Sequence, residues 1–161
     1  IRASEPKRVA EALVPFLRQG GYDDEAMARI PGGPEALVSP LRERSQTLLD
    51  MVEGAAPYLA EPMVMEEGAA SKHLTTAIAP ILKEFADLVE TEPDFSKDRL
   101  EHLLHSLIER HALKMGKVAQ PLRVALTGRT VSPGIFEVML LLGKERTIQR
   151  IRSGVERALK N

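Results

Sequence analysis

The sequence contains no cysteine among its 161 residues. A disulfide framework, a thiol nucleophile and a zinc site with cysteine ligands are therefore excluded, and a reducing compartment is favoured. Long apolar runs are also missing, because a stretch such as Val138 to Leu142 is far shorter than the about 20 residues of a membrane-spanning helix. The N-terminus lacks the layout of a signal peptide. We expect a cytoplasmic protein that does not enter a membrane.

Motifs of the common catalytic sites are missing as well. The sequence has no GxSxG nucleophile elbow, no GxGxxG or GxxxxGK[ST] phosphate loop and no HExxH zinc motif. His102 and His105 would share one face of a helix, but His111 falls well away from both at about 100° per residue. We therefore expect no catalytic residue, no metal ion and no cofactor in this chain. This favours a binding module over a small enzyme.

The formal net charge of −1 conceals an uneven distribution of charged groups. Residues 1–100 carry 11 basic and 18 acidic groups, a net charge of −7, whereas residues 101–161 carry 11 basic and 5 acidic groups, a net charge of +6. A local positive excess of this size suits a polyanionic partner. It is also consistent with a solvated helix surface and with basic groups that complement helix C-termini.

Apolar residues recur at helical spacing through most of the chain. Leu100 and Leu104 belong to such a stripe, and Ser96 precedes it as an N-cap, which predicts a helix over 97–112. A second stripe predicts an amphipathic helix over 144–160. No segment alternates with the period of a strand. We predict an all-α protein with roughly seven to nine helices.

Capping residues and glycines predict the first helices. Ser4 precedes a helix that ends near Gly20, and Asp23 caps a short helix that reaches Ile30. A glycine- and proline-rich break follows at 32–34.

Prolines predict boundaries in the middle of the chain. Ser39 and Pro40 supply the N-cap and the first residue of a helix over 40–54. A further helix over 71–91 is expected to break at Pro80, because proline lacks the backbone donor and clashes with the preceding turn.

A loop with two prolines is predicted over 56–68. We expect it to separate two helical subdomains, residues 1–66 and residues 67–161.

The most distinctive segment covers residues 116–138. It predicts a helix, a tight turn at Gly128 and a second helix that Ser132 and Pro133 cap and begin, with Arg123 near the turn. Arginine forks, hydroxyl groups and helix N-terminal amides can bind splayed RNA bases. The same residues also make a well-capped helical hairpin, so both interpretations stay open on these grounds.

Residues 118–151 read VAQPLRVALTGRTVSPGIFEVMLLLGKERTIQRI. This run resembles the C-terminal anticodon-binding domain of bacterial glutamyl-tRNA synthetases, whose pattern is close to QPLRxALTGxxxSPGxFExxxxLGKExxxxRI. The match is long and ungapped. Ile1-Arg2 and the segment from Val14 to Leu17 also resemble the start of this region.

The resemblance implies an all-α anticodon-binding domain made of two helical subdomains. Members of the family attach glutamate to tRNA, with ATP and Mg, in an N-terminal Rossmann-type domain whose HIGH and KMSKS signatures are not in this sequence. The chain begins at Ile1 rather than Met and would be about a third of a longer, monomeric enzyme, with no aminoacylation activity of its own. Its partners would be the anticodon loop of tRNA(Glu) and the enzyme's own N-terminal catalytic domain.

In the family, the arginine of QPLR and the SPGxF turn contact the first and second anticodon bases. The matching positions, with Thr130 beside them, are Arg123, Ser132, Pro133, Ile135 and Phe136. Phe136 is expected to pack beneath the turn rather than to stack on a base.

Residues 41–48, LRERSQTL, resemble the RxRxxTL segment of the first subdomain, where an arginine reads the third anticodon base. Arg44 takes that place, and Arg42 is its companion. Cytosine offers the acceptors O2 and N3 to an arginine fork, whereas guanine offers N–H donors there. Arg44 is therefore expected to favour the glutamate anticodon, which ends in C, over the glutamine anticodon, which ends in G.

The runner-up interpretation is a helical protein-protein interaction module whose basic C-terminal face meets an acidic protein. In that case the QPLR turn would be purely structural. Steep weakening of binding with salt, through counterion release, would favour tRNA as the partner.

Overall fold

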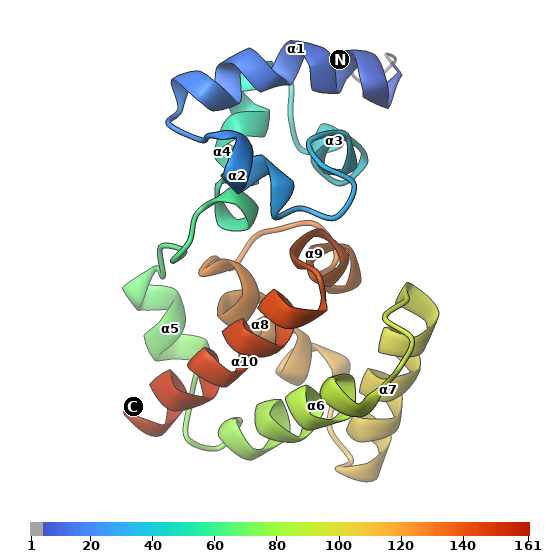
Figure 1. Ribbon diagram of the computed structural model, residues 1–161. Helices are drawn as coiled ribbons and strands as arrows, with labels where there is room; N and C mark the ends of the chain where they lie inside the picture. The colour runs from blue at the N-terminus through green and yellow to red at the C-terminus, as the bar shows by residue number, and fades with distance from the viewer. Residues whose placement is uncertain (1–4) are drawn as a thin grey trace. The chain divides into compact units, whose positions relative to one another are not determined.

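The computed structural model describes residues 5–161, and all regular structure in this range is α-helical (Figure 1). The predicted all-α class is therefore confirmed. None of the described helices is long and apolar enough to span a membrane. The ten helices of the described range are α1 (Pro6–Gln19), α2 (Asp24–Ala28), α3 (Glu35–Arg42), α4 (Leu48–Leu59), α5 (Glu67–His73), α6 (Ala79–Thr91), α7 (Lys97–Arg110), α8 (Met115–Thr127), α9 (Ile135–Leu142) and α10 (Lys144–Leu159).

Chain packing divides the molecule into two compact units, Ile1–Val64 and Met65–Asn161. The first unit contains α1 to α4 and the second contains α5 to α10. The segment that joins them runs from the end of α4 at Leu59 to the start of α5 at Glu67. Of the two prolines of the predicted loop, Pro62 lies in this segment and Pro57 lies inside α4.

The first unit is built around α1, which packs against α3 and α4. Asp23 caps α2 as predicted, since its carboxylate accepts the N–H of Ala26 at 2.9 Å. Gly20 ends α1 as predicted, whereas Ser4 lies outside the described residues. The fully buried side chains of this unit include Leu13, Leu17, Ile30, Leu37, Met51 and Tyr58.

The predicted start of a helix at Pro40 is wrong. Pro40 lies inside α3, and α4 begins only at Leu48. Thr47 starts α4 with a capping box: its hydroxyl accepts the N–H of Asp50 (3.1 Å), and the Asp50 carboxylate accepts the N–H of Thr47 (3.2 Å). Pro40 removes one backbone hydrogen bond from a short helix whose apolar face is buried, and this packing outweighs the local cost. Because α3 and α4 are separate helices, the described range contains ten helices, more than the predicted seven to nine.

Boundaries in the rest of the chain follow the sequence more closely. Ser96 caps α7, and its hydroxyl accepts the N–H of Arg99 at 3.3 Å. The predicted loop over 56–68 is shorter than expected, because α4 continues to Leu59 and α5 starts at Glu67. The helix break expected at Pro80 lies before this residue, between α5 and α6. Pro80 itself is in the first turn of α6, where a backbone N–H would have no partner within the helix.

The second unit is organised by α10, which packs against α6, α8 and α9 (Figure 1). Gly154 of α10 is buried where this helix meets α8. A Cβ at this position would lie 2.7 Å from the Cβ of Ala125 and 3.6 Å from its Cα. The absence of a side chain at Gly154 is therefore what allows the two helices to approach this closely.

Several basic groups of α10 are paired within the second unit. Arg152 lies 3.0 Å from a carboxylate oxygen of Asp87 and 2.6 Å from one of Glu90, both on α6. Arg157 lies 2.8 Å from a carboxylate oxygen of Glu67 on α5. Part of the positive excess of residues 101–161 is thus neutralised by the protein itself.

We predict that Gly154→Ala destabilises the protein by about 1–3 kcal/mol, because the added methyl group meets a Cβ that is fixed to the α8 backbone. Gly68→Ala is the matched control, since an added Cβ meets nothing within 4 Å in α5. Urea denaturation measures the free energy of unfolding of both variants and of the wild type. A Gly154→Ala protein as stable as the wild type would contradict the close helix contact.

Candidate nucleic-acid interface

The corner between α8 and α9 is the first candidate site. Gly128 ends α8 in a left-handed conformation with φ of 76°, and its N–H donates to the carbonyl of Val124 at 2.7 Å. The loop over 129–134 follows. The prediction that Ser132 and Pro133 cap and begin the second helix is wrong: α9 starts at Ile135 and Gly134 is its N-cap. The Ser132 hydroxyl is engaged within the loop, where it donates to the carbonyl of Pro133 at 2.7 Å.

Two side chains of the QPLR motif hold this loop against α8. The Arg123 guanidinium donates from Nε to the hydroxyl of Ser132 (2.8 Å) and from Nη1 to the side-chain oxygen of Gln120 (2.6 Å). The side-chain amide of Gln120 donates to the backbone carbonyl of Thr130 at 2.9 Å. A chain of three hydrogen bonds thus fixes the loop at two points. Gln120 was not among the predicted site residues, although its place in the QPLR motif was a signal for it.

Buried polar side chains form hydrogen bonds with the backbone groups at the C-terminal end of α8. The Thr127 hydroxyl accepts the N–H of Arg129 (3.1 Å) and donates to the carbonyl of Arg123 (2.8 Å). Arg150 of α10 is 5% exposed and donates from Nη1 to the carbonyl of Leu126 at 2.8 Å. A guanidinium at this position also complements the negative end of the helix dipole. These contacts make the base of the loop rigid.

The residues predicted for the first two anticodon bases lie in this one corner, but they differ in exposure. Thr130 is exposed, and Arg123 and Phe136 are half-buried. The side chains of Ser132, Pro133 and Ile135 are buried, so they shape the loop rather than project from it. The largest apolar side chain that the loop presents is Val131, which is 66% exposed and was not predicted.

The second candidate site lies in the first unit, between α3 and α4. Arg42 is the last residue of α3 and is half-buried, with its Nε and Nη2 atoms shielded from solvent. Arg44 is exposed. The turn beneath it is anchored by buried Ser45, whose hydroxyl donates to the carbonyl of Leu41 at 2.8 Å. This turn therefore exposes Arg44 to solvent, whereas Arg42 lies against the protein.

Metal-binding groups do not gather at either site. No cluster of three or more His, Asp or Glu side chains placed to hold a metal ion occurs within residues 5–161. The polar chemistry that the α8–α9 corner offers is hydrogen bonding by side chains and by loop backbone groups.

We predict that Thr127→Val destabilises the second unit by about 1–2 kcal/mol, because valine keeps the shape but removes the acceptor of the Arg129 N–H. Thr127→Ser keeps the hydroxyl and is the control. Urea denaturation of both variants checks this expectation, and equal stabilities of the valine and serine proteins would contradict it.

Comparison with known proteins places the chain in a family. The model of the anticodon binding domain family matches residues 8–155. The chain is 42% identical over 155 residues to glutamate–tRNA ligase 1 of Syntrophus aciditrophicus (strain SB), and 40% identical over 157 residues to the glutamate–tRNA ligase of Geotalea uraniireducens (strain Rf4). Each alignment covers 96% of this chain and 32% of the relative, so the chain spans about a third of their length.

A solved structure agrees with this assignment at the level of the fold. The crystal structure of a glutamate tRNA ligase from Elizabethkingia meningosepticum superposes with a TM-score of 0.81 at 24% sequence identity, over 96% of this chain and 30% of that one. The resemblance that the QPLR and SPGxF motifs indicated is confirmed, and the chain belongs to the anticodon-binding domain family.

Proposed function

We propose that this chain is the anticodon-binding region of a glutamyl-tRNA synthetase and that it binds the anticodon loop of tRNA(Glu). The observation that carries the proposal is the hydrogen-bonded corner at Arg123 and Ser132, whose residues match the family's anticodon-reading motif. The ligase chemistry, with ATP and Mg, would belong to a catalytic domain outside this chain. The role of this chain would be to select the tRNA that the monomeric enzyme charges.

The corner suits the recognition of unstacked bases. Single-stranded RNA loops expose base edges, which hydrogen-bond to protein donors and acceptors, and base faces, which pack on apolar or planar side chains. The loop over 129–134 offers backbone groups and the exposed hydroxyl of Thr130, and Val131 offers an apolar surface. Because Gln120 and Arg123 already fix the loop, little conformational entropy would be lost when RNA binds. In this proposal the buried Ser132, Pro133 and Ile135 act by setting the loop conformation.

Arg44 is the proposed reader of the third anticodon base. Its exposure at the turn between α3 and α4 leaves its guanidinium open to a base edge. The guanidinium can donate to the adjacent O2 and N3 acceptors of cytosine. Guanine presents N–H donors at the same place, and these cannot accept from an arginine. An enzyme with this arginine would discriminate tRNA(Glu) from tRNA(Gln).

We expect Arg123→Ala to weaken binding of a tRNA(Glu) anticodon stem-loop by roughly tenfold or more, because the loop over 129–134 loses its anchor. Arg123→Lys keeps the charge but cannot hold both partners, so it should resemble the alanine variant. Lys160→Ala removes an exposed positive charge at the end of α10 and is the control for charge alone. Fluorescence anisotropy over a series of salt concentrations measures all three. Competition by an acidic protein but not by the stem-loop would contradict the proposal and favour a protein-protein interaction module.

We expect Arg44→Gln, introduced into the full-length enzyme, to reduce the preference for tRNA(Glu) over tRNA(Gln) by a factor equivalent to about 1–3 kcal/mol. Arg8→Gln is the matched control, because Arg8 is an exposed arginine of α1. The measurement is kcat/KM for glutamylation of each tRNA. If the wild-type enzyme charges both tRNAs equally, Arg44 is not a discriminating residue.

A further inference from the structure

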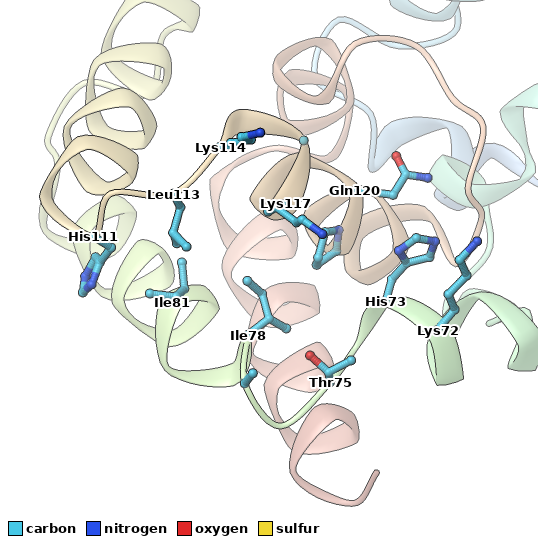
Figure 2. A pocket seen from close by; sticks show the side chains of 13 residues that line it. Lys72, His73, Thr75, Ile78, Ile81, His111, Leu113, Lys114, Lys117 and Gln120 are labelled. Carbon is cyan, nitrogen blue, oxygen red and sulfur yellow. The ribbon is translucent and has the colours of Figure 1, made fainter.

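A groove of about 1000 Å³ lies in the second unit (Figure 2). Its walls come from α5, α6, the segment between α7 and α8, and the start of α8. We call it the basic groove and define it by three lysines and three apolar residues, Lys72, Lys114, Lys117, Ile78, Leu113 and Pro121. Its volume is at the upper end of the range of about 300–1,000 Å³ that small-ligand sites occupy.

The charge of the basic groove has one sign. No Asp or Glu lines it, and its three lysines are exposed and make no ion pair within residues 5–161. Other lysines of the same unit are paired: Lys83 lies 3.0 Å from a carboxylate oxygen of Asp87. At one end of the groove, His111 contacts the carboxylate of Glu84 at 3.1 Å. A cleft with an uncompensated positive rim attracts a polyanion.

The floor of the basic groove is apolar. Ile78, Leu113 and Pro121 contribute to it, and His73 also lines the groove, between Lys72 and Gln120 in the view of Figure 2. Partial burial and the neighbouring Lys72 ammonium both lower the pKa of His73, which favours the neutral form of its ring. A neutral imidazole beside aliphatic side chains is a surface on which the face of a base can pack. Positive groups above an apolar floor fit a nucleotide, because each nucleotide joins a phosphate to a base with a flat face.

The basic groove is continuous with the candidate anticodon site. Gln120 lines the groove and also donates to the carbonyl of Thr130 in the loop over 129–134. Lys117 and Arg123 lie on the same helix, about 9 Å apart along its axis. Gln120 therefore joins the wall of the groove to the loop over 129–134.

We propose that the basic groove is a second RNA subsite, which binds unpaired nucleotides next to the anticodon triplet. Lys72, Lys114 and Lys117 hold phosphates, and a base packs on the apolar floor. The proposal rests on the proposed function and extends it: the loop over 129–134 reads the triplet, and the groove binds the adjoining strand without regard to its sequence.

Gly116→Glu tests the proposal, because Gly116 lines the groove and an added Cβ meets nothing within 4 Å. A carboxylate in the first turn of α8 also complements the helix dipole, so the fold is retained. Gly68→Glu is the matched control, since Gly68 is equally open in the first turn of α5 and does not line the groove. The dissociation constants are measured for two anticodon stem-loops, one with the glutamate triplet and one with a changed triplet, over a range of salt concentrations.

We expect Gly116→Glu to weaken binding of both RNAs by the same factor, roughly three- to tenfold at low salt, and to reduce the salt dependence. Gly68→Glu should bind like the wild type. The pair Lys72→Ala and Lys117→Ala should repeat the effect, against the control pair Lys83→Ala and Lys160→Ala. Equal affinities for the groove variants and their controls, or a loss confined to the glutamate triplet, would overturn the proposal.

The same measurements separate this proposal from the proposed function. A wild-type chain that does not prefer the glutamate triplet refutes anticodon reading. A uniform loss in the groove variants would still support an RNA subsite in that case. Conversely, a clear preference for the triplet with no effect of Gly116→Glu refutes the groove alone.

Discussion

The close approach of α10 to α8 at Gly154 and Ala125 is the constraint on which the second unit depends. At this separation α10 places the buried guanidinium of Arg150 on the carbonyl of Leu126. That contact satisfies the C-terminal end of α8, from which the loop over 129–134 departs. A unit with few aromatic residues thus obtains a rigid surface from helix contact and polar satisfaction rather than from a large aromatic core.

Side chains of α8 also hold the loop of the α8–α9 corner in place. Gln120 and Arg123 are three residues apart, so their side chains lie on one face of the helix and reach two points of the same loop. Recognition of RNA by a fixed loop avoids the entropic cost of ordering the loop on binding. The hydroxyl of Ser132 contributes to this arrangement as an acceptor from Arg123, a different role from the helix cap that its sequence context suggested.

The folded structure shows which of the charged groups are paired within the described part of the protein and which are not. The positive excess of residues 101–161 includes Arg152 and Arg157, whose charges are balanced by carboxylates of α6 and α5. The lysines left without ion pairs in the described range instead include Lys114 and Lys117 at the start of α8, together with Lys72 of the acidic part of the chain. Net charge per segment therefore indicated a polyanionic partner but not the surface that would meet it.

The sequence by itself determined the features that depend on neighbouring residues. Helical periodicity, the caps at Asp23 and Ser96 and the stop at Gly128 are local, and the motif from Gln120 onward identified the family. Tertiary structure decided that α3 tolerates Pro40, because burial of the helix outweighs one lost hydrogen bond. It also decided which arginine of the turn before α4 is exposed and which lysines are unpaired, since both depend on residues far apart in the chain that only packing brings together.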